Sequence, residues 1–146
     1  ELVRQVSNGD GYEPQKCVVI DEREEVSGSG SFDLGLRTDV LLGCPKTMGL
    51  MMALRALSPE LLATDEIGAK GELEALCEAG NSGVKILATA HCRDMEELRA
   101  RSFFRRLLET GLIKRVVFLS GKLGRGTVEA VYGEGGEPLL KTPFVL

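Results

Sequence analysis

Acidic side chains follow two apolar runs of the chain, and the only histidine follows a third. Asp65 and Glu66 come directly after LLAT, Asp21 ends the run KCVVID, and His91 follows VKILATA. Short β-branched runs of this kind predict strands buried on both faces. If these strands are parallel, their carboxyl ends meet at one edge of the sheet, where ligands of such sheets bind. The sequence therefore predicts one polar site.

The Asp65–Glu66 pair suits Mg²⁺-dependent nucleotide hydrolysis. An aspartate can hold the water shell of Mg²⁺, and a glutamate can polarise the water that attacks the phosphate. The simpler alternative is that Asp65 caps the next helix while Glu66 is solvated. For DEREE at 21–25, the alternative is a charged loop in which Arg23 pairs locally. A lone histidine after a strand is more often a structural hydrogen-bonding residue than a catalyst.

Predicted strands and helices alternate along most of the chain. After a polar lead-in, we expect strands at 16–21, 61–65, 84–90 and 115–120, and helices at 48–57, 72–81 and 94–110. The Gly- and Ser-rich segment 22–49 is interpreted as a long connection. The segments 127–132 and 139–145 predict a closing antiparallel hairpin. This order indicates an α/β fold, with a parallel sheet covered by helices on both faces.

Composition limits the classes of function. The chain has 146 residues, 43% of them hydrophobic, and a net charge of −4, which fits one domain and disfavours non-specific binding to nucleic acid or anionic membranes. No apolar run approaches the roughly 20 residues of a membrane span. The cysteines, Cys17, Cys44, Cys77 and Cys92, show no metal-type spacing and are expected to be reduced thiols in the cytosol.

A nucleic-acid interface is the weaker interpretation of the basic segment at 99–115. Its members are Arg99, Arg101, Phe103, Phe104, Arg105, Arg106, Lys114 and Arg115. Interleaved aromatic and basic residues can bind single strands. Helical spacing instead predicts that the two phenylalanines face a core while the arginines are solvated.

Four stretches together resemble the stage III sporulation protein AA family, sporulation ATPases related to the type II and type IV secretion ATPases. They are VVIDEREEV, LGLRTDVLLGCPKTMGLMMALRALSPELLATDEIG, EALCEAGNSGVKILATAH and GLIKRVVFLS. The resemblance covers about residues 16–132. It implies a RecA-like P-loop NTPase core that uses ATP and Mg²⁺. It also implies a homo-oligomeric ring in the cytoplasm, peripheral to a membrane-embedded sporulation or secretion complex.

The resemblance also implies roles for individual carboxylates. LLATDEIG would be the Walker B segment, with Asp65 on the Mg²⁺ side and Glu66 as the catalytic carboxylate. The segment at 21–24 resembles the acidic box of the secretion ATPases. Asp21 of this box would contribute to nucleotide binding, while Glu22, or Glu25 just after the box, would help to place water and metal.

Three further residues receive roles through the same likeness. TAH at 89–91 resembles the histidine box, so His91 would sense the γ-phosphate. Arg37 and Arg55 are candidates for reaching the phosphates bound by a neighbouring subunit.

The chain lacks the G-x-x-x-x-G-K-[ST] loop that cradles phosphates in this class. GCPKT at 43–47 has Pro where the loop needs Gly, so we interpret Lys46 and Thr47 as the start of a helix. GKLGRG at 121–126 is interpreted as a turn. We therefore expect the later part of an ATPase domain whose first strand and P-loop lie outside these residues, and which alone is inactive.

In the strand order that the resemblance implies, the missing strand lies between 84–90 and 115–119. The sheet must then close the gap, borrow a strand from residues 1–15 or from another chain, or be loosely folded. Closure or borrowing is expected. A different class of function also remains open, namely a non-catalytic interaction module that keeps the ATPase fold for docking.

Overall fold

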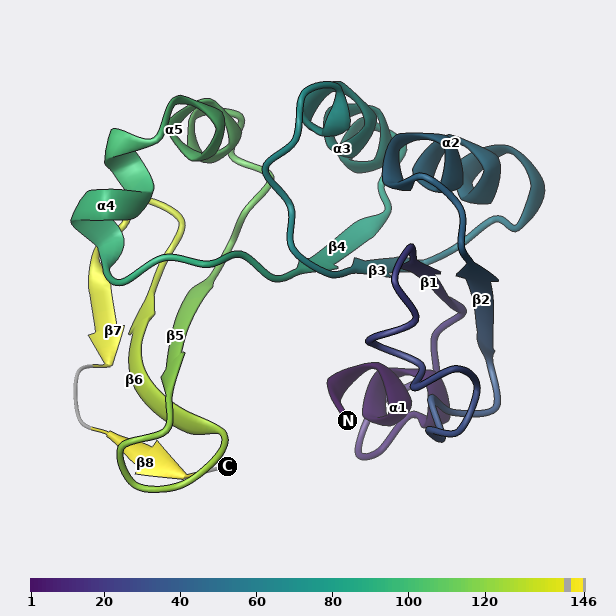
Figure 1. Ribbon diagram of the computed structural model, residues 1–146, viewed down its shortest axis with the longest axis horizontal. Helices are drawn as coiled ribbons and strands as arrows, with labels where there is room; N and C mark the ends of the chain where they lie inside the picture. Colours follow the sequence, from purple (N-terminus) through teal and green to yellow (C-terminus); the bar gives the residue numbers. More distant parts are fainter. Residues whose placement is uncertain (141–142, 146) are drawn as a thin grey trace. The chain divides into compact units, whose positions relative to one another are not determined.

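The computed structural model describes residues 1–140 and 143–145. The chain divides into two compact units, Glu1–Ala90 and His91–Leu146 (Figure 1). Each unit contains its own sheet, so the two are described in turn. The single ATPase domain expected from the sequence stays a prediction.

The first unit is built on a parallel sheet of four strands. These are β1 (Cys17–Asp21), β2 (Thr38–Leu42), β3 (Leu61–Thr64) and β4 (Lys85–Ala88), in the order β2-β1-β3-β4. Every residue of β1 is fully buried, which explains the apolar run that precedes Asp21. Because all four strands run in one direction, their carboxyl ends share one edge of the sheet.

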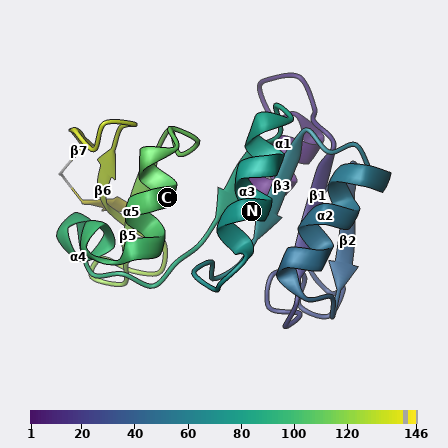
Figure 2. The same ribbon diagram turned by 90° about the horizontal axis from the view of Figure 1, so that it is seen from above.

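Helices cover both faces of this sheet. α1 (Leu2–Asn8) packs against β1 and β2, while α2 (Lys46–Ala56) and α3 (Glu72–Asn81) lie together on the opposite face (Figures 1 and 2). On the α1 side, Val3 joins a core cluster with alternate residues of β1 and β3, namely Cys17, Val19, Leu61 and Ala63. This arrangement confirms the α/β fold class expected from the sequence.

A glycine lets α2 approach β1 closely. A Cβ atom placed on Gly49 would lie 2.6 Å from Cγ2 of Ile20, which is closer than side-chain atoms tolerate. Gly49 lies three residues after Lys46, the first residue of α2. The close contact therefore holds the first turn of the helix near the sheet.

The second unit has two helices and an antiparallel sheet. Its elements are α4 (Met95–Ala100), α5 (Ser102–Glu109), β5 (Val116–Ser120), β6 (Thr127–Tyr132), β7 (Pro138–Leu140) and β8 (Phe144–Val145). Strand β6 pairs with β5, β7 and β8. Segment 121–126 connects β5 to β6, which confirms the predicted turn there. The predicted strand at 139–145 includes residues 141 and 142, which lie outside the described residues.

Most predicted elements are confirmed, and two elements were missed. β2 lies inside the segment interpreted as a connection; it is an edge strand with no fully buried residue, so its pattern is weak. α1 lies in the polar lead-in, where Val3 and Val6 supply the helical spacing that packs against the core.

One of the expected repairs of the sheet, a strand borrowed from residues 1–15, was wrong. β4 lies at the edge of the first sheet and β5 at the edge of the second, in separate units, so closure of the gap between them stays a prediction. Residues 2–8 form a helix and supply no strand, because their apolar residues recur at helical rather than alternating spacing. Borrowing from another chain stays a prediction.

Among residues 1–140 and 143–145, no helix is long and apolar enough to cross a bilayer. All four cysteines are free.

Candidate functional site

The polar site lies at the carboxyl edge of the parallel sheet of the first unit. Strands β1 and β3 are neighbours, and Ile20 pairs with Thr64 in their register. The next residue on each strand is an aspartate, Asp21 on β1 and Asp65 after β3. The sheet therefore places the two aspartates on adjacent strands, as the sequence predicted.

Asp21 is fully buried and holds the loop that follows β1. Its Oδ1 accepts hydrogen bonds from the N–H groups of Glu25 and Val26, at 2.9 and 3.2 Å. Its Oδ2 accepts from the N–H and the hydroxyl of Ser27, at 2.8 and 2.7 Å. Burial by itself would raise the pKa of Asp21, but these hydrogen bonds outweigh it and lower the pKa below its usual value. Both carboxylate oxygens are thus occupied within the protein.

Asp65 is also buried, but its surroundings differ. Its Oδ1 lies 3.0 Å from Nζ of Lys46, and both side chains are only 10% exposed. The same oxygen makes no well-directed hydrogen bond within the described residues. Glu72 contributes a second carboxylate, with Oε1 4.0 Å from the Lys46 ammonium. Asp65 therefore has a charge partner but keeps one oxygen without a directed donor.

Glu66 follows Asp65 and points toward solvent. Its side chain is 45% exposed, and Oε2 lies 3.2 Å from Nη1 of Arg23. The alternative in which Arg23 pairs only within its own loop is therefore wrong, because this arginine reaches across to the end of β3. Glu66 also has a φ of 23°, a conformation that side chains rarely adopt. Strained backbone of this kind clusters at functional sites.

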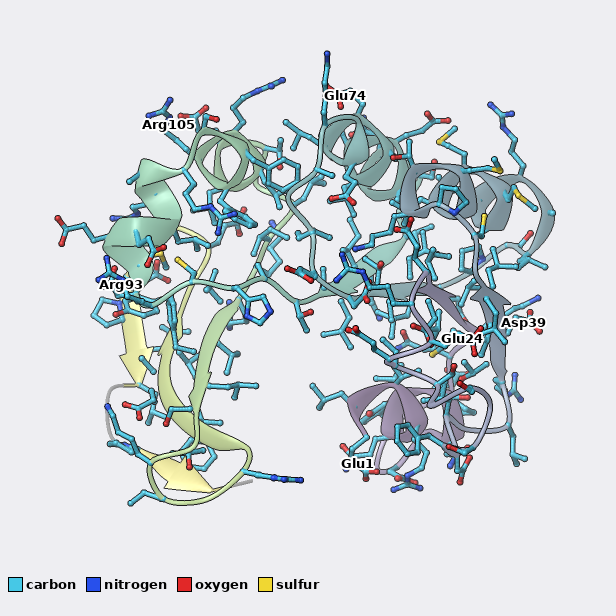
Figure 3. All side chains as sticks on the ribbon, viewed as in Figure 1. Glu1, Glu24, Asp39, Glu74, Arg93 and Arg105 are labelled. Atoms are coloured by element: carbon cyan, nitrogen blue, oxygen red, sulfur yellow. The ribbon has the colours of Figure 1, made fainter. Side chains whose placement is uncertain are left out.

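Glu22 and Glu25, the other two predicted carboxylates, are exposed in the loop after β1. Glu24, labelled in Figure 3, lies in the same loop with a φ of 59°. The hydrogen bonds to Asp21 fold this loop back on the strand end. The structure thus places two further carboxylates in a loop anchored at the predicted site.

His91 is the first residue of the second unit, three residues after β4 ends. Its backbone carbonyl accepts a hydrogen bond from Nη1 of Arg101 at 2.7 Å. The role of His91 as a γ-phosphate sensor stays a prediction. Arg37 and Arg55 both belong to the first unit and are exposed. Their reach to a neighbouring subunit is likewise a prediction.

Three residues of this edge were missed as site residues. Lys46 was interpreted only as the start of a helix, and Glu72 and Thr89 as ordinary members of their segments. Glu72 is 4% exposed, and its Oε2 accepts from the N–H groups of Gly68 and Ala69 at 2.7 and 2.9 Å. A sequence signal existed for Lys46, because a lysine in the first turn opposes the helix dipole and needs another reason to be there.

The residues present fit a Mg²⁺ site of the kind found in nucleotide hydrolases. Within the described ranges, no three His, Cys, Asp or Glu side chains form a metal-binding group. Mg²⁺ in nucleotide sites keeps several waters and is bound through one or two carboxylates and the phosphates. Asp65, with its buried Oδ1 lacking a directed donor, matches that requirement.

In the basic segment at 99–115, the aromatic and basic side chains divide between a core and the solvent. Phe104 is 3% exposed, while Arg105 and Arg106 are exposed. The Arg101 guanidinium stacks over the Phe104 ring at 4.7 Å. This segment therefore packs a small core, as the alternative predicted, and nucleic-acid binding stays the weaker interpretation.

The fold is similar to that of a solved ATPase structure. The X-ray structure of the Legionella pneumophila ATPase DotB matches 88% of this chain with a TM-score of 0.52, at 15% sequence identity and over 35% of its own length. That likeness concerns the fold alone.

The family of this chain is established by sequence comparison. The family described as sporulation stage III, protein AA matches residues 1–139. Stage III sporulation protein AA of Bacillus subtilis (strain 168) is 38% identical over 136 residues, which cover 90% of this chain and 44% of that protein. The chain therefore belongs to the stage III sporulation protein AA family, and it spans less than half the length of this curated relative.

Proposed function

We propose that this chain forms part of an ATPase whose hydrolytic centre contains Asp65 and Glu66. One observation carries the proposal: a buried aspartate with an oxygen that lacks a directed donor stands next to an exposed glutamate, at the carboxyl end of a parallel strand. The first carboxylate is held in place and the second can meet water. The family and the fold support the same function.

The chain's own residues would share the chemistry as follows. Bound Mg²⁺ would supply positive charge to the phosphates, and Asp65 would hold it through its water shell. Glu66 would orient the attacking water and take its proton. Glu22 and Glu25 would help to place this water, and His91 would contact the γ-phosphate. A phosphate-binding loop would come from a part of the protein outside these 146 residues.

The proposal extends to assembly. The exposed Arg37 and Arg55 would face nucleotide bound by a neighbouring copy, in a homo-oligomeric ring. Such a ring would couple ATP hydrolysis to a membrane-embedded sporulation or secretion complex, which it would meet from the cytoplasm.

The test is Glu66→Gln in the full-length protein. The amide keeps the shape of the side chain but accepts a proton poorly, so ATP binding should persist while turnover falls about 100-fold or more. Glu78→Gln, an exposed position on α3, is the matched control and should keep turnover. Binding is measured by nucleotide titration and turnover by phosphate release.

Unchanged turnover in Glu66→Gln would contradict the assignment. If the wild-type protein shows no Mg²⁺-dependent nucleotide binding, the non-catalytic interaction module becomes the better account.

A further inference from the structure

The backbone carbonyls of Asp65 and Glu66 converge on one cation, the ammonium of Lys46, whose side chain is 10% exposed. Nζ of Lys46 lies 3.0 Å from the carbonyl oxygen of Asp65 and 2.9 Å from that of Glu66. In an extended strand successive carbonyls point in opposite directions, so two of them cannot meet one donor. The positive φ of Glu66 bends the chain at this point, and both carbonyls are hydrogen-bonded to Lys46.

The N–H groups of Glu66 and Ile67 are held by the residue that follows β4. The N–H of Glu66 donates to Oγ1 of Thr89 at 2.9 Å, and the N–H of Ile67 donates to the carbonyl of Thr89 at 2.8 Å. Thr89 directly follows β4. The strained peptide is therefore fixed from two elements, α2 through Lys46 and the end of β4 through Thr89.

The placement of Lys46 is not explained by the stability of its helix. It opens α2, where positive charge opposes the helix dipole. Its side chain is buried between the carboxylates of Asp65 and Glu72. A lysine is almost never buried without such partners. Its contacts are thus directed at the end of β3.

We infer that Lys46 and Thr89 are positioning residues that clamp the Asp65–Glu66 peptide, so that Asp65 faces inward and Glu66 faces solvent. This inference rests on the proposed function, in which the two carboxylates need these opposite directions. Neither residue touches the reacting atoms; both act through the backbone of the pair. Loss of either contact lets Glu66 relax toward ordinary backbone angles and misdirects its carboxylate.

The experiment uses two pairs of variants in the full-length protein. Lys46→Met removes the ammonium, with Lys70→Met as the control because Lys70 is exposed two residues before α3. Thr89→Val removes the hydroxyl acceptor at an exposed position, so it tests the clamp even if Lys46→Met fails to fold. Thr89→Ser keeps the hydroxyl and should behave as the wild type.

Two readouts are needed. Amide hydrogen exchange in a peptide spanning residues 64–68 should rise about 10-fold in Lys46→Met and in Thr89→Val, but not in Lys70→Met or Thr89→Ser. ATP turnover should fall about 10-fold in the first two variants, while KM for ATP stays within about twofold, because the phosphates are bound elsewhere.

The outcomes separate the clamp from the proposed function. Exchange that is unchanged in both Lys46→Met and Thr89→Val overturns the clamp. Faster exchange with wild-type turnover also overturns the inference, since the contacts are then structural only. Faster exchange in a protein whose wild type never hydrolyses ATP upholds the clamp and rejects the proposed function.

Discussion

Asp21 and Asp65 stand at the ends of adjacent strands of one sheet, but their surroundings differ. Asp21 accepts four hydrogen bonds from residues 25–27, so its oxygens are fully engaged in holding a loop. Asp65 faces the Lys46 ammonium, and its Oδ1 lacks a directed hydrogen bond. A buried carboxylate whose oxygens all accept directed hydrogen bonds is fixed by the protein, whereas one held by an ion pair alone keeps hydrogen-bonding capacity for a ligand. We therefore expect Asp21 to hold structure and Asp65 to act on a ligand, and both roles stay predictions.

The largest expected effect is a difference in the free energy of unfolding between variants of Asp21 and of Asp65. Asp21→Asn should lower the free energy of unfolding by about 3 kcal/mol, because the amide presents N–H groups to donors and leaves buried groups unsatisfied. Asp65→Asn should cost about 1 kcal/mol, since Lys46 keeps Glu72 and two carbonyl partners. Melting temperatures of the full-length protein measure both. Equal losses would remove the distinction.

A smaller effect concerns pH. The folded-state pKa of Asp21 lies below its value in the unfolded chain. The unfolded state therefore binds protons first on acidification, and the stability that Asp21 contributes is present above pH of about 4 and lost as pH falls further. Melting temperatures between about pH 6 and 3 should decline more steeply in the wild type than in Asp21→Asn, with Glu78→Gln behaving as the wild type. Parallel curves for all three would contradict the assigned hydrogen bonds.

The sequence was sufficient to predict the polar edge of the sheet, because the pattern that predicts it lies in neighbouring residues of the chain. Fully buried strands give apolar runs, and Asp21 and Asp65 follow such runs directly. Those runs predicted β1, β3 and β4, and parallel topology brings their ends together. The edge strand β2 gave a weaker pattern because its burial is partial.

The contacts that join the site residues could not be predicted from local patterns, although the position of Lys46 in its helix was itself unusual. The contact between Lys46 and Asp65 joins residues 19 positions apart, and that between Thr89 and Glu66 spans 23. The Lys46 contact depends on how closely α2 packs on β1, where Gly49 lies against Ile20. The different partners of the Asp21 and Asp65 carboxylates arise from tertiary contacts. The sequence alone therefore did not predict them.

The measurement that tests the account most directly is metal binding by the two aspartate variants. Mn²⁺ can stand in for Mg²⁺, and its free signal in electron paramagnetic resonance reports how much is bound with ATP to the full-length protein. Asp65→Asn should weaken this binding about 10- to 100-fold, as expected when a group that holds the metal's water shell is changed. Asp21→Asn, measured well below its melting temperature, should bind within about threefold of the wild type. Unchanged binding by Asp65→Asn, or an equal loss in Asp21→Asn, would contradict the division between the two aspartates.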